Sequence, residues 1–140
     1  MQVVAAVAGA ISGMAETVIE EMLAKPSKSD RWPEEVRPLV AQVRDGLAVL
    51  NEAVAFVKSQ PGTAYRNLVA RKIVDMAIYL LIGALFCDHA TAKEEKLAVA
   101  RYWLAWRMPE LRMLAEQVRS GEDAILRNFE ALAGPLPAAE

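Results

Sequence analysis

The side chains best suited to metal binding or proton transfer lie around the single histidine of the chain. His89 follows Asp88, and Glu94 and Glu95 come shortly after it. Imidazole and carboxylate groups together can hold a metal ion or act as a general base. A helical di-iron centre takes two Glu-x-x-His motifs, and the sequence contains none. We therefore interpret His89 as a residue at a helix C-terminus, where positive charge is favoured, and predict no metal site.

The single cysteine is the next candidate for chemistry, because a thiolate is a strong nucleophile. Cys87 ends an apolar run, and no cationic residue precedes it there to lower the pKa of its thiol. We predict that Cys87 is a small core residue. One cysteine also excludes a disulfide within the chain.

A group of polar residues enters the same apolar segment. Asp75 lies one helical turn from both Arg71 and Tyr79. Such an aspartate is either a catalytic carboxylate or the partner of a cation, here Arg71 or Arg101 of the next helix. We predict the structural role, a buried polar network of Arg71, Asp75, Tyr79 and Arg101. With no glycine-rich phosphate loop and no Ser/His/Asp set, we predict no catalytic and no cofactor-binding residue in this chain.

Helices must position these side chains, because apolar residues recur at helical spacing and no segment alternates with a period of two. Glycine, proline and small polar residues divide the chain at 25–34, 59–63 and 88–91. The helices are expected over about 3–24, 34–58, 63–89, 91–120 and 122–132. This pattern predicts an all-α, antiparallel up-down four-helix bundle with a short fifth C-terminal helix. We expect a single domain over 1–132 and a flexible Pro/Ala tail over 133–140.

Each long segment has an expected core face. In the first it is Val4, Val7, Ile11, Met14, Val18 and Met22. In the second it is Leu39, Val43, Leu47, Leu50, Val54 and Val57. The run 76–87 of the third has no polar side, so we expect other helices to surround it.

Several residues carry signals for where helices begin, bend and end. Thr63 is a predicted N-cap, and Thr91 with Glu94 has the spacing of a capping box. Pro109 is expected to kink the fourth helix, and Gly121 to end it.

The fourth segment has two apolar faces. Its expected core stripe is Leu97, Ala100, Leu104, Met108 and Leu111. Nearly opposite, on a helical wheel, lie Val99, Trp103, Trp106 and Met113. Large exposed aromatic patches are uncommon on monomers, so we predict that this second face is a protein–protein interface.

Composition limits the classes of function. The 140 residues are 54% hydrophobic and 24% charged, with a formal net charge of −2. This charge gives none of the general attraction that nucleic-acid binding uses, and no apolar run is long enough to span a bilayer. We therefore expect a soluble, cytoplasmic protein whose partners are neither nucleic acid nor membrane.

Three segments also resemble, in order, the helical C-terminal extension of bacterial acyl-CoA dehydrogenases. They are 39–57, 73–90 and 95–123. The matching motifs are Tyr79-Leu80-Leu81-Ile82-Gly83, then Lys96 with Ala100-Arg101-Tyr102-Trp103, then Met108-Pro109-Glu110 and Ser120-Gly121. Met108 stands where that group usually has leucine.

The resemblance implies a non-catalytic domain that serves assembly or packs against the catalytic part of a dehydrogenase. The parent reaction would be flavin-dependent α,β-dehydrogenation of acyl-CoA, with FAD held in the parent enzyme and none in this chain. The implied partner is a second copy or that catalytic domain. One alternative is a free-standing helical module that binds a ligand or regulates a partner. Another is a small helical enzyme of the chorismate-mutase type, with Arg71, Lys72 and Arg101 inside the bundle.

Overall fold

Four long helices and two short ones make up the part of the chain that the computed structural model describes, residues 13–134. The helices are α2 (Met14–Ala24), α3 (Arg37–Ser59), α4 (Ala64–Ala92), α5 (Lys96–Arg119), α6 (Ala124–Arg127) and α7 (Phe129–Ala133). The first twelve residues and the last six, most of the predicted tail, lie outside this range. No described helix combines the length and apolar character needed to cross a membrane.

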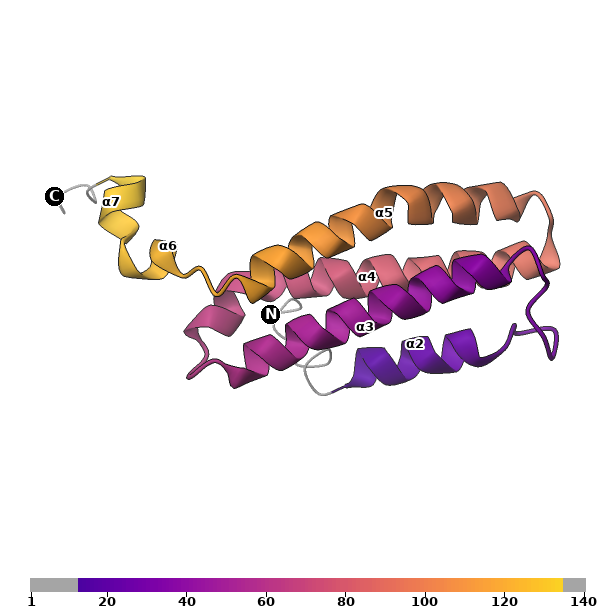
Figure 1. Cartoon of the computed structure of the whole chain (residues 1–140), viewed down its shortest axis with the longest axis horizontal. Coiled ribbons are helices and arrows are strands. Elements are labelled where there is room, and N and C mark those ends of the chain that lie inside the picture. The colour runs from indigo at the N-terminus through magenta and orange to yellow at the C-terminus, as the bar shows by residue number, and fades with distance from the viewer. Residues whose placement is uncertain (1–12, 135–140) are drawn as a thin grey trace, which may run out of the picture.

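Consecutive long helices run in opposite directions, which confirms the predicted up-down bundle (Figure 1). The helices α3 and α4 pack against each other and form the centre. Both also contact α2 on one side and α5 on the other. The short helices α6 and α7 pack on each other and project beyond one end of the bundle.

The core confirms two of the predicted apolar faces and corrects one. All six residues predicted on the core face of α3 are buried. In α5 the predicted stripe is buried as well, with Leu97 only partly covered. In α2, however, Met14 and Val18 are exposed, and Ile19 and Leu23 are the buried pair. The inward side of α2 is thus rotated from the predicted one, whose Val4, Val7 and Ile11 lie outside the described residues.

Two glycines allow the three largest helices to approach closely. A Cβ atom at Gly46 of α3 would lie 2.6 Å from Cδ2 of Leu80 and 3.1 Å from Sδ of Met108. At Gly83 of α4 it would lie 3.1 Å from Cδ2 of Leu104. Side chains of the neighbouring helices therefore fill the space above each glycine.

The helix α4 is not surrounded on every side, contrary to the prediction from its apolar run. Its buried face includes Ile73, Met76 and Leu80, but Ile78 and Leu85 are exposed. Because α2 and α5 sit on either side of the α3–α4 pair, one side of α4 remains uncovered.

The helix ends differ in part from the sequence signals. Thr63 is the N-cap of α4 but makes no capping hydrogen bond through its side chain. The predicted capping box at Thr91 is wrong, because α4 continues through this residue and its hydroxyl donates back to the carbonyl of Cys87. Gly121 ends α5 as predicted, with a φ of 68° that favours glycine. The predicted fifth helix is interrupted at Asn128, which separates α6 from α7.

The loop between α2 and α3 closes one end of the bundle through side-chain hydrogen bonds. The indole N–H of the buried Trp32 donates to the carbonyl of Leu23 at 2.8 Å, and the guanidinium of Arg44 donates to the same oxygen at 2.9 Å. Nearby, the carboxylate of Asp88 accepts the backbone N–H and the hydroxyl of Ser27, both at 2.7 Å. The loop is therefore fixed to α2 and α4, and α3 holds the end of α2.

We predict that Gly46→Ala lowers the free energy of unfolding by about 1–2 kcal/mol. The added methyl overpacks the crossing with Leu80 and Met108, which costs more than the roughly 1 kcal/mol that alanine gains in helix propensity. Urea titration followed by circular dichroism measures the change. Gly83→Ala, whose nearest contact is longer, is the milder control. If the Gly46→Ala protein were as stable as wild type, Gly46 would not be needed for the close approach of α3 to Leu80 and Met108.

Candidate interaction surface

The side of α5 that faces away from the bundle carries a row of large apolar side chains. We call Val99, Tyr102, Trp106 and Met113 the outward face of α5; all four are exposed. Tyr102 is 67% exposed and Trp106 is 61% exposed, and their rings lie 6.1 Å apart. Three of the four residues predicted for an interface, Val99, Trp106 and Met113, thus point to solvent, and the interface itself stays a prediction.

Trp103 was predicted to belong to this face, and the structure places it elsewhere. Its indole N–H donates to the backbone carbonyl of Tyr79 at 3.0 Å. Its ring meets those of Tyr79 and Phe86 edge-on, at centroid distances of 6.2 and 5.7 Å. Trp103 lies at the border between the two faces of α5, and α4 covers that border. It is therefore part of the α4–α5 contact.

Arg107 completes this aromatic cluster, and we did not predict it from the sequence. Its guanidinium lies 4.8 Å from the centre of the Trp103 ring and 5.1 Å from that of Tyr79. It also forms an ion pair with Glu110 at 2.9 Å. The sequence signal for this contact is spacing: Arg107 lies four residues after Trp103 and three before Glu110, so all three can meet on one side of a helix. Burial raises the pKa of Tyr79, and the nearby carboxylate of Glu110 raises it further.

The predicted buried polar network is not buried. Arg71 and Asp75 form the expected ion pair at 3.0 Å, but Arg71 is 77% exposed. Arg101 is exposed and joins no ion pair among the described residues. Arg71 and Asp75 lie toward the uncovered side of α4, so water screens the ion pair between them, whose contribution is about 0.5 kcal/mol. The inward cations that a chorismate-mutase-type site requires are therefore not provided by Arg71 and Arg101.

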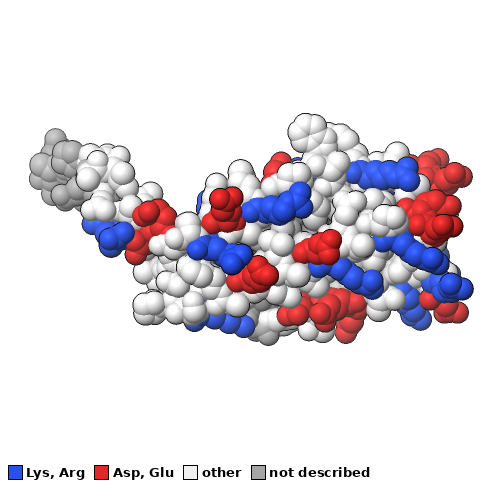
Figure 2. Space-filling model, viewed as in Figure 1, with Lys and Arg blue, Asp and Glu red and all other residues white. Residues whose placement is uncertain are grey.

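Charges of both signs are interspersed over the face drawn in Figure 2, and no large area of one sign stands out there. His89 is exposed beside the ring of Phe86. Among the side chains that the structure describes, no three of His, Cys, Asp or Glu gather closely enough to hold a metal ion.

An open cleft of about 720 Å³ lies where α4 and α5 meet the short C-terminal helices. Its walls are largely apolar and include Leu68, Met113, Ile125 and Leu132. Lys72, Glu116 and Glu122 supply its charged groups. Met113 thus belongs both to the cleft and to the outward face of α5, so the two apolar areas are continuous.

We predict that Trp103→Ala destabilises the protein and Trp106→Ala does not. Removing Trp103 takes away its hydrogen bond and two ring contacts, at a cost of about 2 kcal/mol or more. Trp106 is exposed, so its removal should change the free energy of unfolding by less than about 0.5 kcal/mol. Urea titration in dilute solution compares the two; equal losses would place both rings in the core.

We also predict that Cys87 is unreactive in the folded protein. The thiol is fully buried, and burial raises its pKa to about 12, so almost no thiolate exists at pH 8. Ellman's reagent should label Cys87 only after unfolding by urea. Rapid labelling without denaturant would show that this part of the core opens readily.

Comparison with known proteins finds no relative of this chain. No family model, no curated protein and no solved structure matches the chain. Its function is therefore inferred from the fold, the surface and the residues themselves.

Proposed function

We propose that this chain is a non-catalytic helical module for protein assembly, and that its outward face of α5 packs against a protein partner. The observation that carries the proposal is the exposure of Tyr102 and Trp106, side by side between Val99 and Met113. Tryptophan, tyrosine and methionine are enriched where proteins meet. Trp106 contributes nothing to the core, so its position is best explained by a contact outside the bundle.

The structure behind this face suits a rigid docking surface. Trp103 and Arg107 hold the adjacent border of α5 against α4 through ring contacts and a hydrogen bond. Along the opposite side of α5, Ala100, Leu104 and Leu111 are buried in the core. A partner would therefore meet a helix whose position is fixed, which lowers the entropic cost of binding.

We further propose that the partner belongs to an acyl-CoA dehydrogenase-like protein of the cytoplasm. The support is the residue pattern, whose motif positions pack together in the bundle. Tyr79 meets Trp103, and Gly83 lies against Leu104. In this setting the chain would serve assembly or pack against the catalytic part, and FAD would be bound by the parent enzyme.

A second candidate function rests on the cleft beside the short C-terminal helices. Its apolar walls and its volume suit a small, largely apolar molecule. The chain would then be a free-standing ligand-binding or regulatory module. Saturable binding of a small apolar dye, abolished by Leu68→Asp and not by Trp106→Ser, would favour this alternative.

We predict that the purified chain is colourless and does not oxidise acyl-CoA thioesters. We also expect it to co-elute with an FAD-loaded catalytic domain of a bacterial acyl-CoA dehydrogenase in size-exclusion chromatography, detected at 280 and 450 nm. The double variant Tyr102→Ser/Trp106→Ser should lose co-elution while its far-ultraviolet circular dichroism stays unchanged. Ile78→Ser/Leu85→Ser, exposed on α4, is the matched control. Equal co-elution of both double variants would exclude the outward face of α5 as the docking surface.

A further inference from the structure

The outer side of α4 carries a regular row of side chains. We call Asp75, Ile78, Ile82, Leu85 and His89 the α4 seam. Its members are three and four residues apart in alternation, which is the spacing of contact positions between paired helices. Ile78, Leu85 and His89 are exposed, while Asp75 and Ile82 are half-buried. The run 76–87 contains no charged residue, so the middle of the seam is apolar and its polar groups lie at the two ends.

The outer side of α3, which pairs with α4 at the centre of the bundle, has a different composition. Asp45, Ala48, Glu52 and Ala55 recur there at the same alternating spacing, and all four are exposed. Alanines and carboxylates suit contact with water. Both central helices thus have uncovered outer sides, but α4 presents isoleucine and leucine there. Such an apolar row is typical of a surface that a partner covers.

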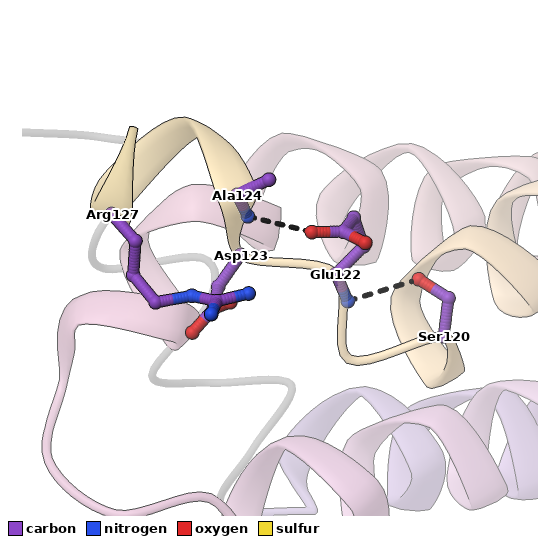
Figure 3. A network of polar contacts seen from close by, with 5 residues as sticks. All are labelled: Ser120, Glu122, Asp123, Ala124 and Arg127. Carbon is purple, nitrogen blue, oxygen red and sulfur yellow. Dashed lines mark hydrogen bonds and ion pairs between the residues drawn. The ribbon is translucent and has the colours of Figure 1, made fainter. Parts of the chain in front are cut away.

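The short C-terminal helices do not cover the seam. After α5 the chain turns at Gly121, where the N–H of Glu122 donates to the hydroxyl of Ser120 at 3.2 Å. The carboxylate of Glu122 then accepts the N–H of Ala124 at 2.7 Å (Figure 3). The helices α6 and α7 therefore project beyond the end of the bundle (Figure 1). The cleft that they border reaches α4 near its start, over 68–72, and not at the seam.

The apolar area extends from the seam onto α2. Val18 and Met22 of α2 line a shallow cleft together with Asp88 of α4, which lies one helical turn beyond Leu85. Val18 and Leu85 are each 45% exposed. A contact on this side would therefore bury side chains of two helices, which widens it toward the area that a stable dimer needs.

The polar ends of the seam complement each other across a twofold axis. Asp75 lies seven residues before Ile82 and His89 seven residues after it. An axis through Ile82, perpendicular to α4, thus brings Asp75 of one copy opposite His89 of the other. Arg71 binds Oδ1 of Asp75, so Oδ2 can accept an N–H of the imidazole. A parallel pair would instead place the two Asp75 carboxylates side by side, which is unfavourable.

We propose that the α4 seam is the contact of a homodimer, in which the α4 helices of two copies pack antiparallel about a twofold axis at Ile82. Ile82 meets its counterpart, and Ile78 of each copy lies beside Leu85 of the other. At both ends of the contact, His89 donates a hydrogen bond to Asp75. The seam is separate from the outward face of α5, so this inference goes beyond the proposed function and leaves that face open to its partner.

Sedimentation velocity on the full chain at about 100 μM tests which face holds the copies together. Wild type should be a dimer. Ile78→Ser/Leu85→Ser should associate about tenfold more weakly or less, and Tyr102→Ser/Trp106→Ser should stay dimeric. All four side chains are exposed, so circular dichroism should stay unchanged. In co-elution with the dehydrogenase domain the two variants should behave the other way round, so the dimer and the proposed function fail through different measurements.

Single cysteines at the ends of the seam test the orientation of the two helices. Asp75→Cys and His89→Cys, mixed and oxidised with copper phenanthroline, should form a disulfide-linked dimer. Neither variant should cross-link when oxidised alone, because its two cysteines would lie about 21 Å apart along the helices. Wild type, whose Cys87 is buried, is the control. Cross-linking of each variant with itself would indicate parallel helices and overturn the proposed axis.

Two further results would overturn the dimer. One is a wild-type chain that stays monomeric at this concentration, and the other is an Ile78→Ser/Leu85→Ser protein that dimerises like wild type. If Tyr102→Ser/Trp106→Ser alone lost the dimer, the copies would meet through α5, and the α4 seam would be excluded as their contact.

Discussion

The close crossing of α3, α4 and α5 is the constraint on which the rest of the molecule depends. Gly46 and Gly83 have no side chains, so Leu80, Met108 and Leu104 enter the space above them. This close packing fixes the rotation of α5 about its own axis, because Leu104, Met108 and Leu111 must point inward together. The same rotation turns Trp106 to solvent and brings Trp103 against α4. The surface that we assign to docking is thus determined by the packing of the core behind it.

Much of this architecture could be predicted from the sequence, because helical periodicity and loop composition are local signals. The core faces of α3 and α5 follow from the spacing of apolar residues, and the end of α5 follows from the glycine at position 121. The core side of α2 could not be found this way, since the exposed Met14 and Val18 are apolar residues like the buried Ile19 and Leu23. Which side of α2 is buried depends on where the α3–α4 pair lies. The position of that pair is set by tertiary packing, which the local sequence of α2 does not encode.

The candidate site also combines features that the sequence predicts with features that only the tertiary structure determines. A helical wheel separates Val99, Trp106 and Met113 from the core stripe correctly, because they lie well away from it. The helical wheel fails for Trp103, because this residue lies at the border between the two faces and packs against α4. The apolar run of α4 also predicts a buried polar network around Asp75, but α4 leaves one side uncovered, and Arg71 and Asp75 lie toward that side. The spacing of residues along α5 does not indicate which partner would bind its outward face.

The Leu23 carbonyl accepts two hydrogen bonds, from Trp32 and from Arg44, and these bonds affect how the native state partially unfolds. The helix α2 has eleven described residues, short enough that its stability comes from docking, and its last turn is held by Trp32 and Arg44. Releasing α2 therefore also frees the indole of Trp32, and releasing the loop leaves the end of α2 with Arg44 of α3 as its remaining donor. The two form one cooperative unit of partial unfolding, distinct from the α3–α4–α5 core. Amide hydrogens of α2 and of the loop should exchange with solvent together, while those beside Gly46 and Gly83 exchange only when the whole molecule unfolds.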